Sequence, residues 1–160
     1  MGRYTQTGLA VLFALSTAAA APGGGDKKTA DQEAVENELE RWQGTWQQVS
    51  IESDDQKSGF AKGQAPLFTI RRDDYTVEVD GKVLERGRLQ LYPGPRPRQF
   101  DLIVQDGETP AKTYPGIYEI KGDELRTCFT RDGGNRPTEF TARSSSGRAI
   151  AVYRRVSLKK

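Results

Sequence analysis

From Gly44 to Val156 the chain alternates short apolar runs with turn residues, at a spacing of about 8–12 residues. The runs are rich in valine, isoleucine, threonine, tyrosine and phenylalanine, which favour strands. Short links join them, and no helical pattern lies between them, so we predict an up-and-down antiparallel β-barrel of eight or nine strands. Closing such a meander removes its exposed edges. The predicted strands are Thr45–Ile51, Leu67–Arg72, Tyr75–Val79, Val83–Leu91, Gln99–Val104, Thr113–Ile120, Glu124–Thr130, Thr138–Arg143 and Ala149–Val156.

Turn residues between the runs support this division of the chain. Asp80-Gly81 is a strong signal for a two-residue hairpin. Residues 121–123 and 144–147 read as tight links, because glycine, aspartate and serine are common in turns. Residues 92–98 hold three prolines, which cannot donate ladder hydrogen bonds, so this stretch is predicted to lie outside the strands.

A different pattern precedes the barrel. Residues 29–42 are rich in good helix formers and carry only a thin apolar stripe, formed by Ala34, Leu39 and Trp42. We predict a short helix that starts at a cap on Thr29 or Asp31. Its stripe is too narrow for an independent core, so the helix should lie against another part of the protein.

The first 20 residues have the pattern of a signal peptide. Arg3 gives a positive start, and the apolar run from Gly8 to Ala21 is 14 residues long. That run is shorter than the roughly 20 residues that a membrane span needs. We expect cleavage after Ala20, export to the periplasm or the medium, and no stable membrane span afterwards. An uncleaved anchor is the alternative. Residues 21–28 would be a flexible tether and residues 43–158 the barrel domain.

Both tryptophans of the chain, Trp42 and Trp46, flank Gly44. A tryptophan at the start of the first strand can plug the floor of the barrel and bury a large apolar area. We therefore predict that Trp46 fills the floor and that Trp42 covers its outside. Gly44 would allow the sharp bend from helix to strand.

Gly44-Thr45-Trp46 resembles the G-x-W motif that opens the first strand of lipocalins and fatty-acid-binding proteins. A closer resemblance is to a lipocalin-like domain family of unknown function that is abundant in planctomycete bacteria. Five segments in order carry it: "WQGTWQQVS", "FDLIV", "YPGIYEIKGDELRTCF", "RPTEF" and "VYRRV", within residues 41–156. The resemblance implies a small calycin-like barrel without demonstrated catalytic activity, exported or attached to a larger protein.

The resemblance also implies a structural arginine. In lipocalins an arginine of the last strand typically covers the first-strand tryptophan. Strand alternation places Ile150, Val152 and Arg154 on one face, so Arg154 is expected over Trp46 and Arg155 in solvent. Fatty-acid-binding proteins hold a carboxylate with an arginine two residues before a tyrosine of the last strand. Here Ala151 stands two residues before Tyr153, which removes the main argument for a fatty acid.

Composition narrows the possible chemistry. The net charge of +2 is spread along the chain, whereas nucleic-acid binding favours a clustered basic face. No histidine is present, which excludes His-based triads and His-ligated zinc. The single cysteine, Cys128, lies in an apolar run and is expected to be buried. The pairs Asp54-Asp55 and Asp73-Asp74 lack the spacing of a calcium loop and are expected to form turns. We expect no catalytic residue, metal or cofactor.

Two functions are favoured for an exported, monomeric barrel, and an enzyme is the third and least favoured possibility. In the first, the barrel mouth binds a small apolar or amphipathic molecule. In the second, the barrel is filled by its own side chains and contacts a protein or cell-envelope partner through residues 52–66 and 105–112, as a protease inhibitor of this shape would. Low apolar content, 35%, favours a filled barrel, because an eight-stranded barrel is just wide enough for side chains to fill.

Overall fold

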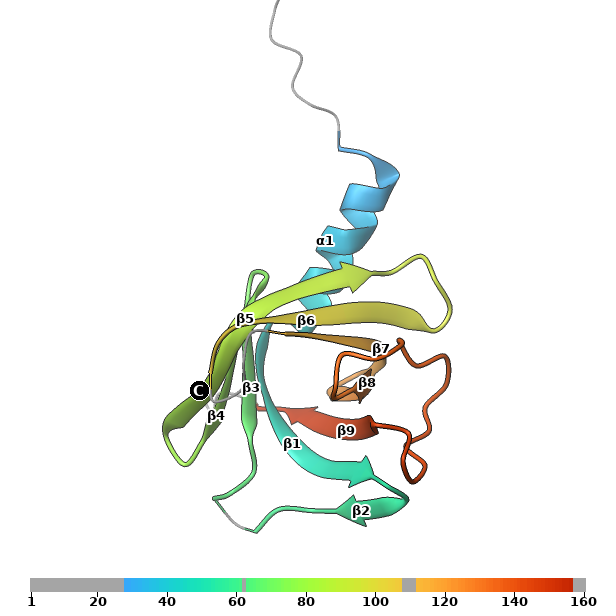
Figure 1. Ribbon diagram of the computed structural model, residues 1–160. Helices are drawn as coiled ribbons and strands as arrows, with labels where there is room; N and C mark the ends of the chain where they lie inside the picture. The colour runs from blue at the N-terminus through green and yellow to red at the C-terminus, as the bar shows by residue number, and fades with distance from the viewer. Residues whose placement is uncertain (1–27, 62, 108–111, 157–160) are drawn as a thin grey trace, which may run out of the picture.

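The computed structural model describes residues 28–61, 63–107 and 112–156. The predicted signal peptide and all of the tether except Lys28 lie outside these ranges. The described residues form one helix and nine strands (Figure 1). In chain order they are α1 (Ala30–Trp42), β1 (Gly44–Ser53), β2 (Gln56–Ser58), β3 (Leu67–Arg71), β4 (Asp74–Val79), β5 (Lys82–Tyr92), β6 (Arg98–Gly107), β7 (Thr113–Lys121), β8 (Glu124–Thr130) and β9 (Arg148–Arg155).

The predicted barrel is confirmed. Strands β3 to β9 pair antiparallel in chain order, and β1 pairs with both β3 and β9, which closes eight strands into a barrel. The short strand β2, which the sequence did not predict, pairs only with the far end of β1 and lies outside the closed ring. The Asp80-Gly81 hairpin is confirmed, and both of its residues have positive φ (50° and 77°). Helix α1 stands at one end of the barrel (Figure 1), and this helix is not long and apolar enough to cross a membrane.

The main core lies inside the barrel. Inward-facing aromatic and aliphatic side chains from all eight closed strands meet there, among them Phe68, Tyr75, Leu89, Phe100 and Tyr118. A second and smaller cluster lies outside the barrel wall and contains Ile117, Cys128, Ala142 and Ile150. The barrel core therefore buries the inner faces of β8 and β9, and this second cluster buries their outer faces.

The predicted strand Thr138–Arg143 is wrong. It belongs to segment 131–147, which connects β8 to β9 in the sequence and is here named the strap. The strap crosses the outside of the barrel and forms no strand. Phe140 and Ala142 of the strap pack on the outer cluster, and Pro137 is fully buried. Because β8 and β9 already pair with each other, the strap finds no free strand edge between them.

Two sets of hydrogen bonds hold the strap to the barrel. Arg136 donates to the carbonyls of Phe100 and Gly116 and to the Asp101 carboxylate (2.7 Å). Asp54 and Asp55, which form the β1–β2 turn with φ values of 53° and 59°, accept from the backbone N–H groups of residues 145 and 144. Their carboxylates thus fix the strap, and the prediction that this pair forms a turn is confirmed.

Helix α1 begins after Thr29, one of the two caps predicted from the sequence. Thr29 is the N-cap and forms a reciprocal capping box with Gln32. Near its other end, Glu38 is almost fully buried and accepts hydrogen bonds from the Tyr118 hydroxyl (3.0 Å) and from Arg41 (2.8 Å). Arg41 also donates to the Ile120 carbonyl (2.9 Å). Polar contacts with β7 therefore fix the helix over one end of the barrel.

Candidate functional site

The end of the barrel below α1 is closed, and Trp46 and Arg155 form its floor. The Trp46 side chain is fully buried, and the guanidinium of Arg155 lies over its ring at 4.0 Å from the centroid. Trp46 Nε1 donates to the Trp42 carbonyl (2.8 Å), and Arg155 donates to the carbonyls of Arg41 (2.9 Å) and Gln43 (2.5 Å). The first and last strands therefore satisfy the carbonyls that the end of α1 leaves unpaired.

Trp46 lies at the floor and Gly44 at the bend before it, the positions predicted for them from the sequence. Gly44 has a φ of +106°, which residues with a side chain rarely adopt. It is the first residue of β1, and only Gln43 separates it from the end of α1. The position of its missing Cβ lies 3.6 Å from Arg155 Nη1. The bend therefore brings the first strand directly under the arginine.

The assignment of Arg154 to this floor is wrong. Arg154 is exposed, and the residue on Trp46 is Arg155. Ala149, Ala151, Tyr153 and Arg155 form the inward face of β9, as the burial of both alanines and the packing of Tyr153 in the barrel core show. Ile150 is buried because the strap covers it from outside. The apolar Ile150 therefore does not mark the inward face of β9, and the predicted orientation of this strand is the reverse of the observed one.

Trp42 also differs from its prediction. It does not cover the outside of the floor but enters the barrel, where its side chain is fully buried. Its ring contacts those of Tyr118 (4.9 Å between centroids), Phe100 (5.6 Å) and Phe68 (6.4 Å). The last residue of α1 thus forms the inner face of the floor, and Trp46 lies below it.

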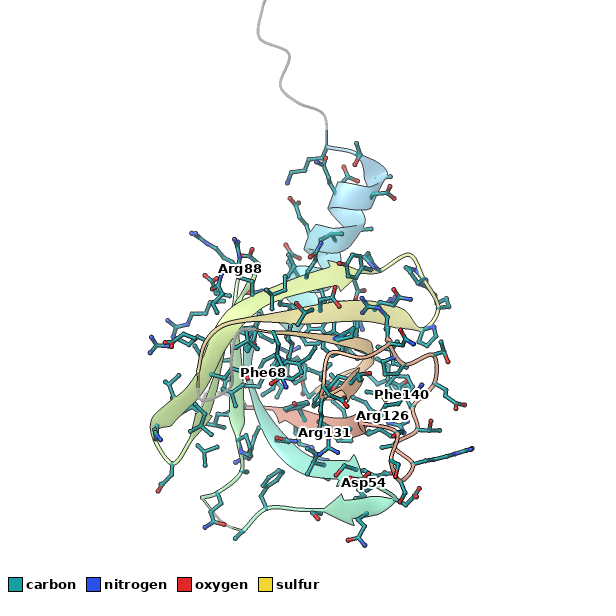
Figure 2. The ribbon with its side chains drawn as sticks, viewed as in Figure 1. Asp54, Phe68, Arg88, Arg126, Arg131 and Phe140 are labelled. Atoms are coloured by element: carbon teal, nitrogen blue, oxygen red, sulfur yellow. The ribbon has the colours of Figure 1, made fainter. Side chains whose placement is uncertain are left out.

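Above Trp42 the barrel contains a cavity of about 470 Å³. Trp42 borders it at the closed end, and Leu84, Glu85, Lys112 and Arg131 border it at the opposite end, near the starts of β5 and β7 and the end of β8. Between these ends its wall is mainly aromatic and aliphatic. The wall consists of Phe68, Val77, Phe100, Leu102, Tyr114, Thr127, Phe129 and Tyr153. Figure 2 shows Phe68 on β3, within the barrel.

Three charged side chains border this cavity. Glu85 accepts a hydrogen bond from the hydroxyl of the buried Tyr75 (2.8 Å). Lys112 lies over the Tyr114 ring, and its ammonium donates to the Arg131 carbonyl (2.6 Å). Arg131 forms an ion pair with Asp54 (3.2 Å), and both are labelled in Figure 2. The cavity therefore combines an apolar wall with a few polar groups at its entrance, as small-molecule sites do.

The Cys128 thiol and the acidic side chains are the other groups whose chemistry the structure bears on. Cys128 is buried beneath the strap, and its thiol donates to the Thr141 carbonyl at 3.6 Å. Burial raises the pKa of this thiol, which keeps it in the less reactive protonated form. In the described ranges, no three Asp, Glu, Cys or His side chains come together where they could hold a metal ion.

The sequence placed the floor but did not identify the cavity. The residues of its wall were assigned to strands, yet nothing in their alternation separated an empty interior from a filled one. The one available signal was the number of large aromatic residues at inward positions of β3, β6, β7, β8 and β9, since such rings can stand apart and leave space between them. Comparisons of the chain with protein-family models, curated proteins and solved structures gave no match.

Proposed function

We propose that this protein binds a small apolar or amphipathic molecule in the open end of its barrel. The observation that carries the proposal is the cavity of about 470 Å³, whose wall is mainly aromatic and aliphatic. Ligand sites of proteins commonly have volumes of about 300–1,000 Å³ and walls of this kind. Trp42 and its neighbours fill the half of the barrel interior next to α1. A ligand would therefore occupy the half next to the open end and contact the Trp42 ring.

The architecture supports a preformed site. Ring contacts fix Trp42 from three strands, and α1 is held to the barrel by Arg155, Glu38 and Arg41. A floor that is already ordered spares the ligand the entropy loss of ordering it, and this favours affinity. The tryptophan also provides a spectroscopic reporter inside the site.

A substitution that fills part of the cavity should weaken binding. We expect N-pentyl dansylamide, a neutral apolar probe, to bind the wild-type protein with increased probe fluorescence. Leu102→Trp adds a ring to the cavity wall and should weaken binding by about tenfold or more, equivalent to about 1.4 kcal/mol. Ile103→Trp is the matched control, because Ile103 is the next residue of β6 and is 36% exposed. It should bind the probe as the wild type does.

Fluorescence titration of the three proteins, each checked for folding by urea unfolding, gives the answer. Absence of probe binding to the wild type, or equal loss in both variants, would contradict a cavity site. In that case the interaction-module function, with a protein or envelope partner, becomes the better explanation.

We further propose that the protein acts outside the cytoplasm, in the periplasm or the medium, on the pattern of residues 1–20. The mature chain should begin at Ala21, because cleavage after Ala20 removes the apolar run and its positive start. N-terminal sequencing of protein purified from the producing cells tests this. Intact Arg3 in a soluble cytoplasmic fraction would contradict it.

A further inference from the structure

Glu85 is the one carboxylate among the described residues that border the cavity. It lies on β5, whose residues Gly87, Leu89 and Leu91 continue along the barrel wall as buried positions. Its Oε1 accepts a hydrogen bond from Tyr75, which is 1% exposed, at 2.8 Å. None of the ion pairs found in the described parts of the chain includes Glu85.

The negative charge of Glu85 acts on the interior. Burial raises the pKa of Tyr75 far above its ordinary value, and the hydrogen bond to Glu85 raises it further. Burial also raises the pKa of Tyr153, which lies elsewhere in the cavity wall, and the charge of Glu85 raises this pKa further. One neutral hydroxyl compensates a partly desolvated carboxylate only in part. The carboxylate therefore remains a strong acceptor for a further donor.

The two cations at the entrance have contacts of their own, with Asp54, the Tyr114 ring and the Arg131 carbonyl. The Arg131 guanidinium forms its ion pair with Asp54 in the β1–β2 turn, on an exposed part of the surface. The Lys112 ammonium is bound to the Arg131 carbonyl, also in an exposed contact, whereas the contact between Tyr75 and Glu85 is partly buried. Of the three charged side chains at the cavity, Glu85 is therefore the one whose hydrogen bond lies partly inside the protein.

We propose that the ligand carries a positively charged nitrogen on an apolar body, that is, an organic ammonium ion. This inference rests on the proposed function and names its ligand class. The ammonium group would donate to the Glu85 carboxylate, forming a charge-assisted hydrogen bond. The apolar body would lie among the rings of Phe68, Phe129 and Tyr153, which line the cavity. Aromatic faces attract cations as well as apolar groups, so this wall suits both parts of such a molecule.

Three dansyl sulfonamides with the same five-carbon chain test the inference. Their chains end in an ammonium group, a methyl group or a carboxylate. The wild type should bind the ammonium probe about fivefold or more tightly than the methyl probe, and the carboxylate probe most weakly. Glu85→Gln keeps an acceptor for Tyr75 but removes the charge, so it should abolish the preference for the ammonium probe without weakening the methyl probe.

Glu78→Gln is the matched control. Glu78 lies on the neighbouring strand β4 and borders a depression with Thr69 and Arg71 instead of the cavity. It removes the same charge from the protein, and the preference for the ammonium probe should persist in this variant. A preference that survives in Glu85→Gln, or disappears equally in both variants, would overturn the inference.

The result also separates this inference from the proposed function. If the methyl probe binds and Leu102→Trp blocks it, the cavity is a ligand site even when the wild type prefers no charge or prefers the carboxylate. Either of those two preferences would overturn the ammonium inference alone, and the second would assign recognition to Lys112. Failure of all three probes to bind would contradict both proposals.

Discussion

Replacing Trp42 by alanine should lower the free energy of unfolding by about 3–5 kcal/mol, the range found for large aromatic truncations in protein cores. The indole is fully buried and contacts the rings of Phe68, Phe100 and Tyr118. Its loss would extend the existing cavity towards the floor instead of letting the core collapse, because the surrounding strands belong to a closed barrel. Urea unfolding followed by circular dichroism measures this change without relying on tryptophan fluorescence.

Two further variants define the origin of this loss. Trp46→Ala should reduce stability by a similar amount, since Trp46 is equally buried below Trp42. Phe140→Ala is the aromatic control, because Phe140 is only half-buried and lies on the strap outside the barrel wall. It should reduce stability clearly less. A loss below about 1 kcal/mol for Trp42→Ala would mean that the helix end does not occupy the barrel interior.

Arg155→Ala should reduce stability by about 2–4 kcal/mol, whereas Arg154→Ala should change it by no more than about 0.5 kcal/mol. Truncation of Arg155 removes the guanidinium from the Trp46 ring and leaves the carbonyls of Arg41 and Gln43 without their donors. It also removes an ion pair with Asp123 (3.3 Å), which is mostly exposed and contributes little. Arg154 is exposed and provides the adjacent control.

A double-mutant cycle isolates the contact between the ring and the guanidinium. Trp46→Ala and Arg155→Ala should show a coupling energy of about 0.5–3 kcal/mol, as residues in direct contact do. Additive losses would place the effect of Arg155 in its hydrogen bonds to α1 alone. A larger loss for Arg154→Ala than for Arg155→Ala would contradict the orientation of β9.

Strand positions could be predicted from the sequence because they depend on local patterns, and barrel closure because a closed meander leaves no exposed strand edge. Asp80-Gly81 fits a tight hairpin at positive φ, and Gly44 fits the bend that follows α1. Thr138–Arg143 has strand-like composition, but a strand also needs a free partner edge. Composition does not report whether such an edge exists, and here β8 and β9 pair with each other.

The orientation of β9 could not be read from alternation. Ala149, Ile150 and Ala151 are all buried, two by the barrel interior and one by the strap, so the pattern carries no period of two at this point. The placement of Trp42 depended on how α1 meets the barrel, and its contacts come from β3, β6 and β7, which are distant in sequence. The cavity likewise results from how inward-facing rings share a common interior.

The pairing of β1 with β9 determines when the floor can form. Trp46 pairs with Arg155, so the ring closes through residues near opposite ends of the barrel sequence. A pairing of this kind must bring together a long intervening loop before it gains any contact energy, and such topologies fold slowly, on a scale of about milliseconds to seconds. During synthesis from the N-terminus, α1 and β1 exist before their last partner has been made. The floor that contains Trp42 and Trp46 can therefore be completed only after β9 has been synthesised.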